Sequence, residues 1–149
     1  MNTVRRMLAI LALLSAVIAT PACARGKPDA ACVPVVRDGW IRLVPGGMPM
    51  HAGFGRFENP CATPATITGA KSASYASVEM HETRLVDGVS RMRAVPTLPV
   101  AAKGSAEFKP GGLHMMLMDP TKPLKAGDKV RIEFALQDGR VVRGEFLVR

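Results

Sequence analysis

Residues 130–148 read VRIEFALQDGRVVRGEFLV and decide the fold class. On both sides of Asp138-Gly139, apolar side chains recur at every second position or nearly so. The apolar members are Val130, Ile132, Phe134, Leu136, Val142, Phe146 and Val148. A period of two is the pattern of a strand with one buried face, and Asp-Gly between two such runs is a hairpin turn signal. The stretch therefore predicts a β-hairpin that closes the chain.

Upstream of this hairpin, turn signals recur at short intervals, and no segment shows the 3.6-residue apolar period of a helix. The expected strands are Trp40–Val44, Gly53–Glu58, Ala65–Ala70, Ser77–Leu85, Val89–Val95 and Leu113–Met118. Pro96–Gly104 carries two prolines, which exclude a central strand, and we interpret it as a crossover between sheets. These patterns predict an all-β, antiparallel sandwich or barrel of about seven to nine strands.

The composition and the motifs narrow the range of possible functions. The chain has 149 residues, 48% hydrophobic and 21% charged, which indicates one globular domain. The formal net charge is +8, but Lys and Arg are spread along the chain and only 5% of residues are aromatic, so we expect no nucleic-acid partner. Neither G-x-S-x-G nor H-E-x-x-H occurs, and no carboxylate pair is clustered, so the sequence does not indicate an enzyme.

Residues 1–24 have the parts of a secretory signal: two arginines, an apolar stretch and small residues up to Ala24. We predict cleavage after Ala24, which leaves residues 25–149 as the exported domain with no membrane span. One alternative is an uncleaved anchor, although about 14 apolar residues are few for a span. Another is a lipid on Cys23, although Thr20-Pro21 is a poor approach to a lipidated cysteine.

Cleavage after Ala24 leaves two cysteines, Cys32 and Cys61. An even pair in an exported chain predicts a disulfide. Two free thiols or a metal-binding thiol pair are the alternatives, but the two residues are far apart and lack the Cys-x-x-Cys spacing of a metal site.

Histidine and methionine gather on the expected strands. In residues 113–118, alternation places His114, Met116 and Met118 on one face and apolar side chains on the other. In the hairpin around Asp87-Gly88, a two-residue turn places Thr83 opposite Met92. His81 is then a diagonal neighbour of Met92, roughly 7 Å away at Cβ.

These side chains form two pairs, each of one imidazole and one thioether. Thioether sulfur is a soft, uncharged ligand that suits Cu(I), whereas zinc sites use thiolate, imidazole or carboxylate. The predicted site is therefore one Cu(I) ion held by His81, Met92, His114 and Met116. Met80 and Met115 lie on the opposite faces of their strands, and we expect them in the core.

The spacing of the four residues is His81-x10-Met92-x21-His114-x-Met116. It resembles, at every position, the motif of the periplasmic copper chaperones called the PCuAC family. The flanking stretches VEMHE at 78–82, MRAV at 92–95 and KPGGLHMMLM at 109–118 are also similar to that family. The resemblance extends over residues 38–149.

The resemblance implies a cupredoxin-like β-sandwich that binds Cu(I) near its surface and works in the periplasm. It implies that the protein supplies copper to the CuA centre of cytochrome c oxidase, directly or alongside Sco-type assembly proteins. Some members carry a carboxy-terminal His- and Met-rich tail that adds Cu(II) binding. Because this sequence ends at Arg149, just after its last expected strand, we expect no such tail site.

Three alternatives remain open from the sequence. Met48-Pro49-Met50-His51 is either an auxiliary copper site or a solvated turn in a loop. An electron-transfer cupredoxin would need a Cys thiolate beside two His, and neither Cys32 nor Cys61 lies in such a cluster. A metal-free, Ig-like interaction module is the third.

Overall fold

The computed structural model describes residues 32–149. The predicted secretory signal, residues 1–24, lies outside the described residues, and so do the predicted cleavage after Ala24 and the alternative of a lipid on Cys23. Within 32–149 the chain forms ten strands: β1 Val35–Arg42, β2 Met50–Glu58, β3 Ala65–Lys71, β4 Tyr75–Val86, β5 Val89–Ala94, β6 Leu98–Val100, β7 Ser105–Phe108, β8 Leu113–Pro120, β9 Lys129–Leu136 and β10 Val141–Val148. This part of the structure has no helix of the length and hydropathy needed to cross a membrane.

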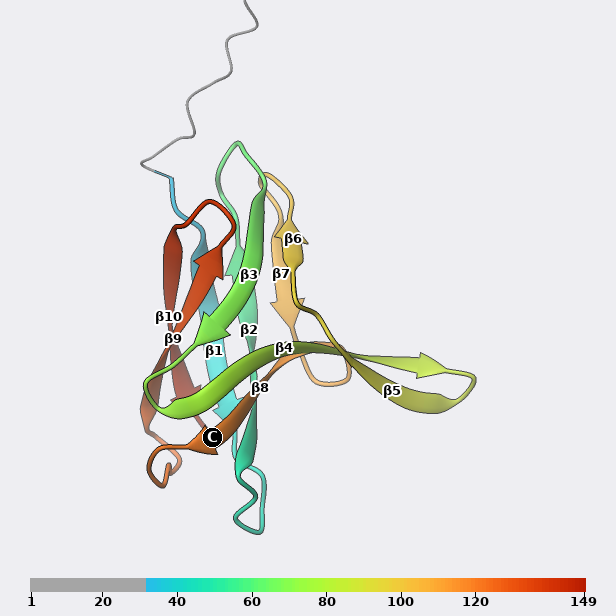
Figure 1. Ribbon diagram of the computed structural model, residues 1–149, viewed down its shortest axis with the longest axis vertical. Helices are drawn as coiled ribbons and strands as arrows, with labels where there is room; N and C mark the ends of the chain where they lie inside the picture. Colours follow the sequence, from blue (N-terminus) through green and yellow to red (C-terminus); the bar gives the residue numbers. More distant parts are fainter. Residues whose placement is uncertain (1–31) are drawn as a thin grey trace, which may run out of the picture.

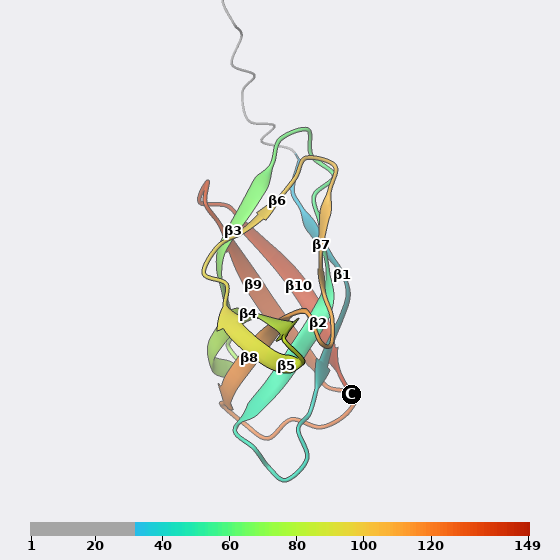
Figure 2. The same ribbon diagram turned by 90° about the vertical axis from the view of Figure 1, so that its right-hand side faces the viewer.

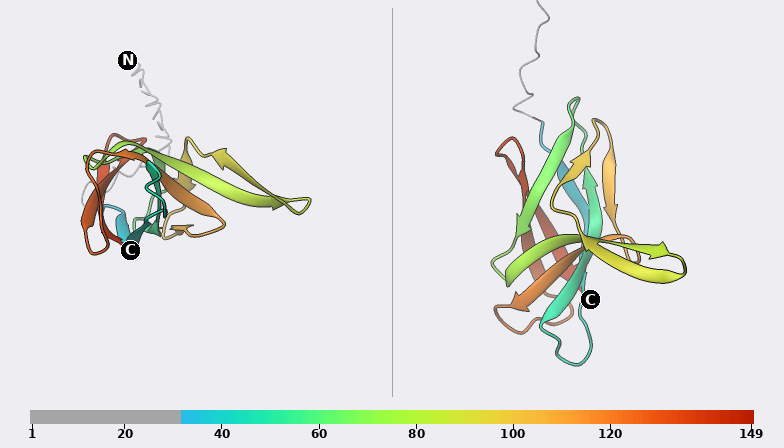
Figure 3. Two further views of the ribbon diagram at one scale, coloured as in Figure 1. Left: turned by 90° about the horizontal axis from the view of Figure 1, so that it is seen from below. Right: turned by 45° about the vertical axis from the view of Figure 1, so that its right-hand side comes forward.

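The strands form one sheet in the order β5-β4-β8-β2-β1-β10-β9-β3-β6, with β7 paired to β2. A further pairing between β3 and β4 closes the sheet on itself, and the ring of strands is visible from below in Figure 3. The predicted all-β class is confirmed. The structure adds one parallel pairing, between β1 and β10, to the otherwise antiparallel sheet.

The closing hairpin of β9 and β10 forms as predicted. Phe134 pairs with Val142, and Val130 pairs with Phe146. The inward residues of both strands are buried while their neighbours are exposed or half-buried. Gly139 takes a positive φ of 85° in the turn, a conformation that glycine adopts without steric cost.

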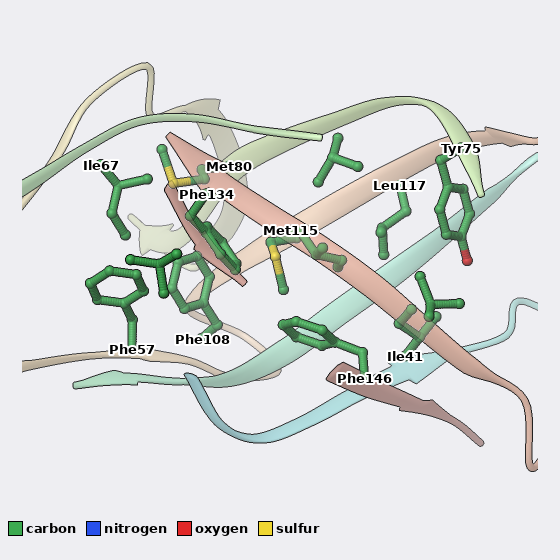
Figure 4. Packing of buried hydrophobic residues seen from close by; sticks show 14 of the residues in the cluster. Ile41, Phe57, Ile67, Tyr75, Met80, Phe108, Met115, Leu117, Phe134 and Phe146 are labelled. Atoms are coloured by element: carbon green, nitrogen blue, oxygen red, sulfur yellow. The ribbon is translucent and has the colours of Figure 1, made fainter. Parts of the chain in front are cut away.

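Aromatic and aliphatic side chains fill the interior of the barrel (Figure 4). Phe134 lies between Phe57 and Phe146, with ring centroids 5.7 and 6.3 Å away. Met80 and Met115 are 5% and 1% exposed, which confirms their assignment to the core. Burial of such side chains contributes about 1.5–3 kcal/mol each and is the main stabilising term of the fold.

Several details of the strand prediction were wrong. The strand expected over Trp40–Val44 runs instead over Val35–Arg42. The segment Pro96–Gly104 contains β6, a short strand at the end of the sheet order. Pro99 is tolerated there because an edge strand need not donate every backbone N–H to a neighbour. The strand β7 was not predicted, because Ser105–Phe108 has too few residues to show a period.

Cys32 and Cys61 form a disulfide, with their Cα atoms 5.6 Å apart, as predicted. The bond ties the segment before β1 to the turn that follows β2.

The hairpin of β4 and β5 leaves the barrel and projects into solvent (Figures 1 and 2). Its turn is made by Asp87 and Gly88, both with positive φ, at 52° and 76°. Two such residues define the turn type that matches the twist of a tight hairpin. Every residue of β5 is exposed, so the hairpin carries its side chains outside the core.

Candidate metal site

Two histidines face each other where the projecting hairpin leaves the barrel. His81 on β4 is the direct cross-strand partner of His114 on β8. Their ring centroids are 6.1 Å apart. The sequence pattern predicted that each histidine pairs with a methionine, but not that the two histidines are opposite one another, because β5, β6 and β7 intervene along the chain.

The two predicted methionines join this pair. Met92 on β5 is the cross-strand partner of Thr83, as the two-residue turn predicted. The Sδ atom of Met92 lies 3.2 Å from Nε2 of His114. Met116 follows His114 by two residues on β8 and shares its face. The barrel and the hairpin thus bring together, at one place, all four residues that the sequence singled out.

The tautomer of His114 is set by a hydrogen bond. Its Nδ1 lies 2.9 Å from the carbonyl oxygen of Gly112. Because a carbonyl only accepts, Nδ1 donates and the neutral ring keeps its lone pair on Nε2. That lone pair faces the sulfur of Met92, which has no proton to share. The nitrogen and the sulfur each present a lone pair, and no hydrogen lies between them. This arrangement is less favourable by itself than with a cation bound to both atoms.

The turn before β8 places that carbonyl. Pro110 and Gly111 occupy its centre, Gly111 with a φ of 76°, and the amide of Gly112 donates to the carbonyl of Lys109 at 3.1 Å. Proline followed by glycine is typical of a type II turn.

His81 is held in the complementary way. Its Nε2 lies 3.0 Å from Oε2 of Glu79, so in the neutral ring Nε2–H donates to the carboxylate and Nδ1 keeps the lone pair. Among the residues that the structure describes, His81 Nδ1 is the one buried side-chain nitrogen or oxygen without a hydrogen-bond partner. A buried acceptor without a partner costs free energy, and a bound metal ion would satisfy it.

The spacing of the two rings fits one ion. A metal–imidazole bond of about 2.1 Å and a ring radius of about 1.2 Å put each centroid roughly 3.3 Å from a shared ion, so two rings on one ion lie at most roughly 6.6 Å apart. The observed 6.1 Å is within this limit. The residues therefore fit a metal with two imidazole and two thioether ligands.

Glu79 and Gly112 orient the two imidazoles and were not singled out from the sequence. Hydrogen bonds of this kind fix which ring nitrogen can bind a metal. Glu79 could have been found, because it lies two residues before His81 and therefore on the same face of the strand. The role of Gly112 depends on the turn geometry and has no comparable signal.

A cleft of about 250 Å³ opens beside these residues and is lined in part by Met92, His114, Met116 and Met50. His81 lies next to it, with 16% of its side chain exposed. Met92 is 54% exposed. An ion held here would lie close to the surface, with one of its ligands on the projecting hairpin.

The segment Met48-Pro49-Met50-His51 is only in part the loop that the sequence predicted, since Met48 and Pro49 precede the strand. Met50 and His51 begin β2. The ring of His51 is buried, with Nδ1 2.9 Å from the hydroxyl of Tyr75. Burial lowers the pKa of His51 from its ordinary 6.5 and raises the pKa of Tyr75 to about 12. Nδ1 of His51 is therefore engaged with a buried hydroxyl.

Three charged side chains of the hairpin lie on its reverse face. Glu82 accepts hydrogen bonds from Arg84 and Arg93 at 3.0 and 2.6 Å. The bond from Arg84, then that from Arg93, holds the pKa of Glu82 below its ordinary value. Because side chains alternate along a strand, these groups point away from the face that carries His81 and Met92. On the face of His81, the carboxylate of Glu79 is the charged group that lies next to the predicted ligands.

The fold is similar to that of PCuAC domains, and two imidazoles and two thioethers lie together at its surface. The copper-bound PCuAC domain from PmoF2 has this fold, with a TM-score of 0.62 and 19% identity, over 76% of this chain and 90% of that one. The Cu(I)-bound form of DR1885 from Deinococcus radiodurans gives a TM-score of 0.61 and 27% identity, over 86% and 83% of the two chains.

The family follows from the sequence comparison. The model of the family described as "Putative lipoprotein LpqE-like" matches residues 35–148, and the chain belongs to that family. A relative named "Putative lipoprotein Lxx21020", from Leifsonia xyli subsp. xyli (strain CTCB07), is 30% identical over 131 residues, which cover 87% of this chain and 78% of the relative.

Proposed function

We propose that this protein is an exported Cu(I) chaperone that binds one copper ion through His81, Met92, His114 and Met116. One observation carries the proposal. Each imidazole donates a hydrogen bond through one nitrogen and keeps a lone pair on the other, at His81 Nδ1 and His114 Nε2. The first of these has no partner, and the second lies against a thioether sulfur.

The ligand chemistry selects the ion. Two imidazoles and two thioethers carry no charge, and thioethers favour Cu(I) while giving Zn²⁺ little. A neutral ligand set leaves the +1 charge of the ion uncompensated, so copper is held less firmly than by thiolates and can be passed on. The proposal is supported by the likeness to the Cu(I)-bound form of DR1885.

We propose that the protein works in the periplasm as a carrier and not as an enzyme, with residues 25–149 as the copper-binding domain. The disulfide between Cys32 and Cys61 supports an oxidising compartment. The family description and the Leifsonia relative both name lipoproteins, which also supports export. For the leader we keep cleavage after Ala24 as the proposal, with a lipid on Cys23 as its rival.

We propose the CuA subunit of cytochrome c oxidase as the recipient, reached directly or with a Sco-type protein. This part of the proposal rests on the resemblance of the His81-x10-Met92-x21-His114-x-Met116 motif to copper chaperones. It is tested by mixing the Cu(I)-loaded protein with an isolated, metal-free CuA domain under anaerobic conditions. Copper should be found on the CuA domain after separation, and copper that stays on the chaperone contradicts this recipient.

The metal site is tested by titrating Cu(I) against a chromogenic chelator without oxygen. The protein should retain one Cu(I) per chain, and a Met92→Leu/Met116→Leu variant should lose it while it stays folded. Zn²⁺ should bind far more weakly. Zinc binding that is as strong, and that survives loss of both methionines, would contradict the proposal. Addition of Cu(II) distinguishes the proposed chaperone from an electron-transfer cupredoxin. A cupredoxin of that class turns blue with Cu(II), and this protein should not.

A further inference from the structure

Two methionines outside the four-residue site meet on the same outer face of the barrel. Met50 on β2 and Met118 on β8 are direct cross-strand partners. Side chains in this relation have Cβ atoms about 4.5–5.5 Å apart. Because methionine has three flexible torsions, both sulfur atoms can reach one ion between them. The two residues are far apart in sequence, so only the sheet register brings them together.

This pair is continuous with the copper site. Met118 follows Met116 by two residues and therefore lies on the same face of β8, roughly 6.6 Å further along. Met50 is the diagonal neighbour of Met116, because Met116 pairs with Ala52. Met50 also lines the cleft that contains Met92, His114 and Met116. The methionines thus occupy neighbouring positions on one face, from the cleft towards the end of β8.

We propose that Met50 and Met118 form a second, weaker Cu(I) site through which copper reaches and leaves the four-ligand site. The inference rests on the proposed function and deepens it. Both side chains are half-buried, so they are accessible to an ion without having to leave the core. The other cross-strand partner of Met118 is Ser77, a hard oxygen donor that does not compete for Cu(I).

The transfer needs only ligand exchange. As the bond from copper to Met116 sulfur forms, a bond to Met50 or Met118 sulfur breaks. Copper remains Cu(I), and no electron or proton moves, since thioethers have no proton to lose. Two thioethers without imidazole bind more weakly than the full set, so copper should prefer the four-ligand site at low loading.

The test follows the methionine methyl groups by NMR during anaerobic titration with Cu(I). The first equivalent should shift Met92 and Met116, and the second should shift Met50 and Met118. We expect the second ion to bind at least about tenfold more weakly than the first. A Met50→Leu/Met118→Leu variant should lose the second step and keep the affinity of the first within about twofold. Leucine preserves volume, so the fold should be maintained.

Met48→Leu is the matched control. Met48 is 48% exposed and lies two residues from Met50, so it belongs to the auxiliary motif that the sequence suggests but not to the cross-strand pair. This variant should keep the second step. A wild-type protein that binds one Cu(I) and shows no second step refutes the inference but leaves the proposed function intact. Loss of the second step in Met48→Leu, with retention in the double variant, also refutes it. Failure of the first equivalent to shift Met92 and Met116 refutes the proposed function itself.

Discussion

Replacing Met92 and Met115 by alanine, one at a time, separates metal binding from packing. Met92 is 54% exposed and Met115 is 1% exposed. Full burial of a methionine contributes about 1.5–3 kcal/mol, so truncating the half-exposed Met92 should cost about 1 kcal/mol or less. In Met115 the same truncation empties a site packed against Gly53, where an added Cβ would lie 2.9 Å from the Met115 methyl group. Its cost should be roughly 2–5 kcal/mol.

Calorimetric melts of the metal-free variants should show this difference. One kcal/mol corresponds to roughly 3–6 °C in a domain of this size, so Met115→Ala should melt at least about twice as far below wild type as Met92→Ala. Cu(I) competition on the folded proteins should show the reverse order. Met92→Ala should lose more than about tenfold in affinity, and Met115→Ala should stay near wild type. Equal melting losses in both variants, or wild-type affinity in Met92→Ala, would refute the assignment of faces.

Three further outcomes are expected. Serine at both Cys32 and Cys61 should lower the free energy of unfolding by roughly 3–4 kcal/mol in urea titrations, and the unreduced, unfolded wild type should show no free thiol in its exported form. Because burial lowers the pKa of His51, the unfolded state binds a proton at higher pH than the folded state does, so the free energy of unfolding should fall as the pH drops below about 6.5. The His51→Gln variant should show a weaker pH dependence of stability. Parallel stability–pH profiles of the variant and the wild type would count against this role of His51. The mass of the exported protein should match cleavage after Ala24, whereas a lipidated Cys23 would add the mass of acyl chains.

The strands that carry the site could be predicted because their alternation is strict. In β8, residues 113–118 combine a wholly apolar face with a face of one histidine and two methionines. The two-residue turn at Asp87-Gly88 then fixed the register of Met92 against Thr83. Both inferences use only contacts within a strand or across a tight turn, where sequence separation determines geometry.

What could not be predicted depends on pairings between distant segments. The opposition of His81 and His114 requires β8 to lie beside β4, and the pairing of Met50 with Met118 requires it to lie beside β2. Local patterns do not specify which strands become neighbours. The prediction of a loop at Met50 and His51 failed for a similar reason, since the strand begins where the barrel offers a partner.

The burial of the core also sets the position of the proposed ligands His114 and Met116. Along β8, Met115 and Leu117 are 1% and 0% exposed, and a shift of one residue in register would exchange them with His114 and Met116. Such a slip would place an imidazole in the apolar interior, at a large cost in free energy. The packing that keeps Met115 inside therefore holds His114 and Met116 outside, whether or not a metal is bound. A site that the core orients in this way needs no copper to form, which suits the proposed role of a carrier that binds its ion and then releases it.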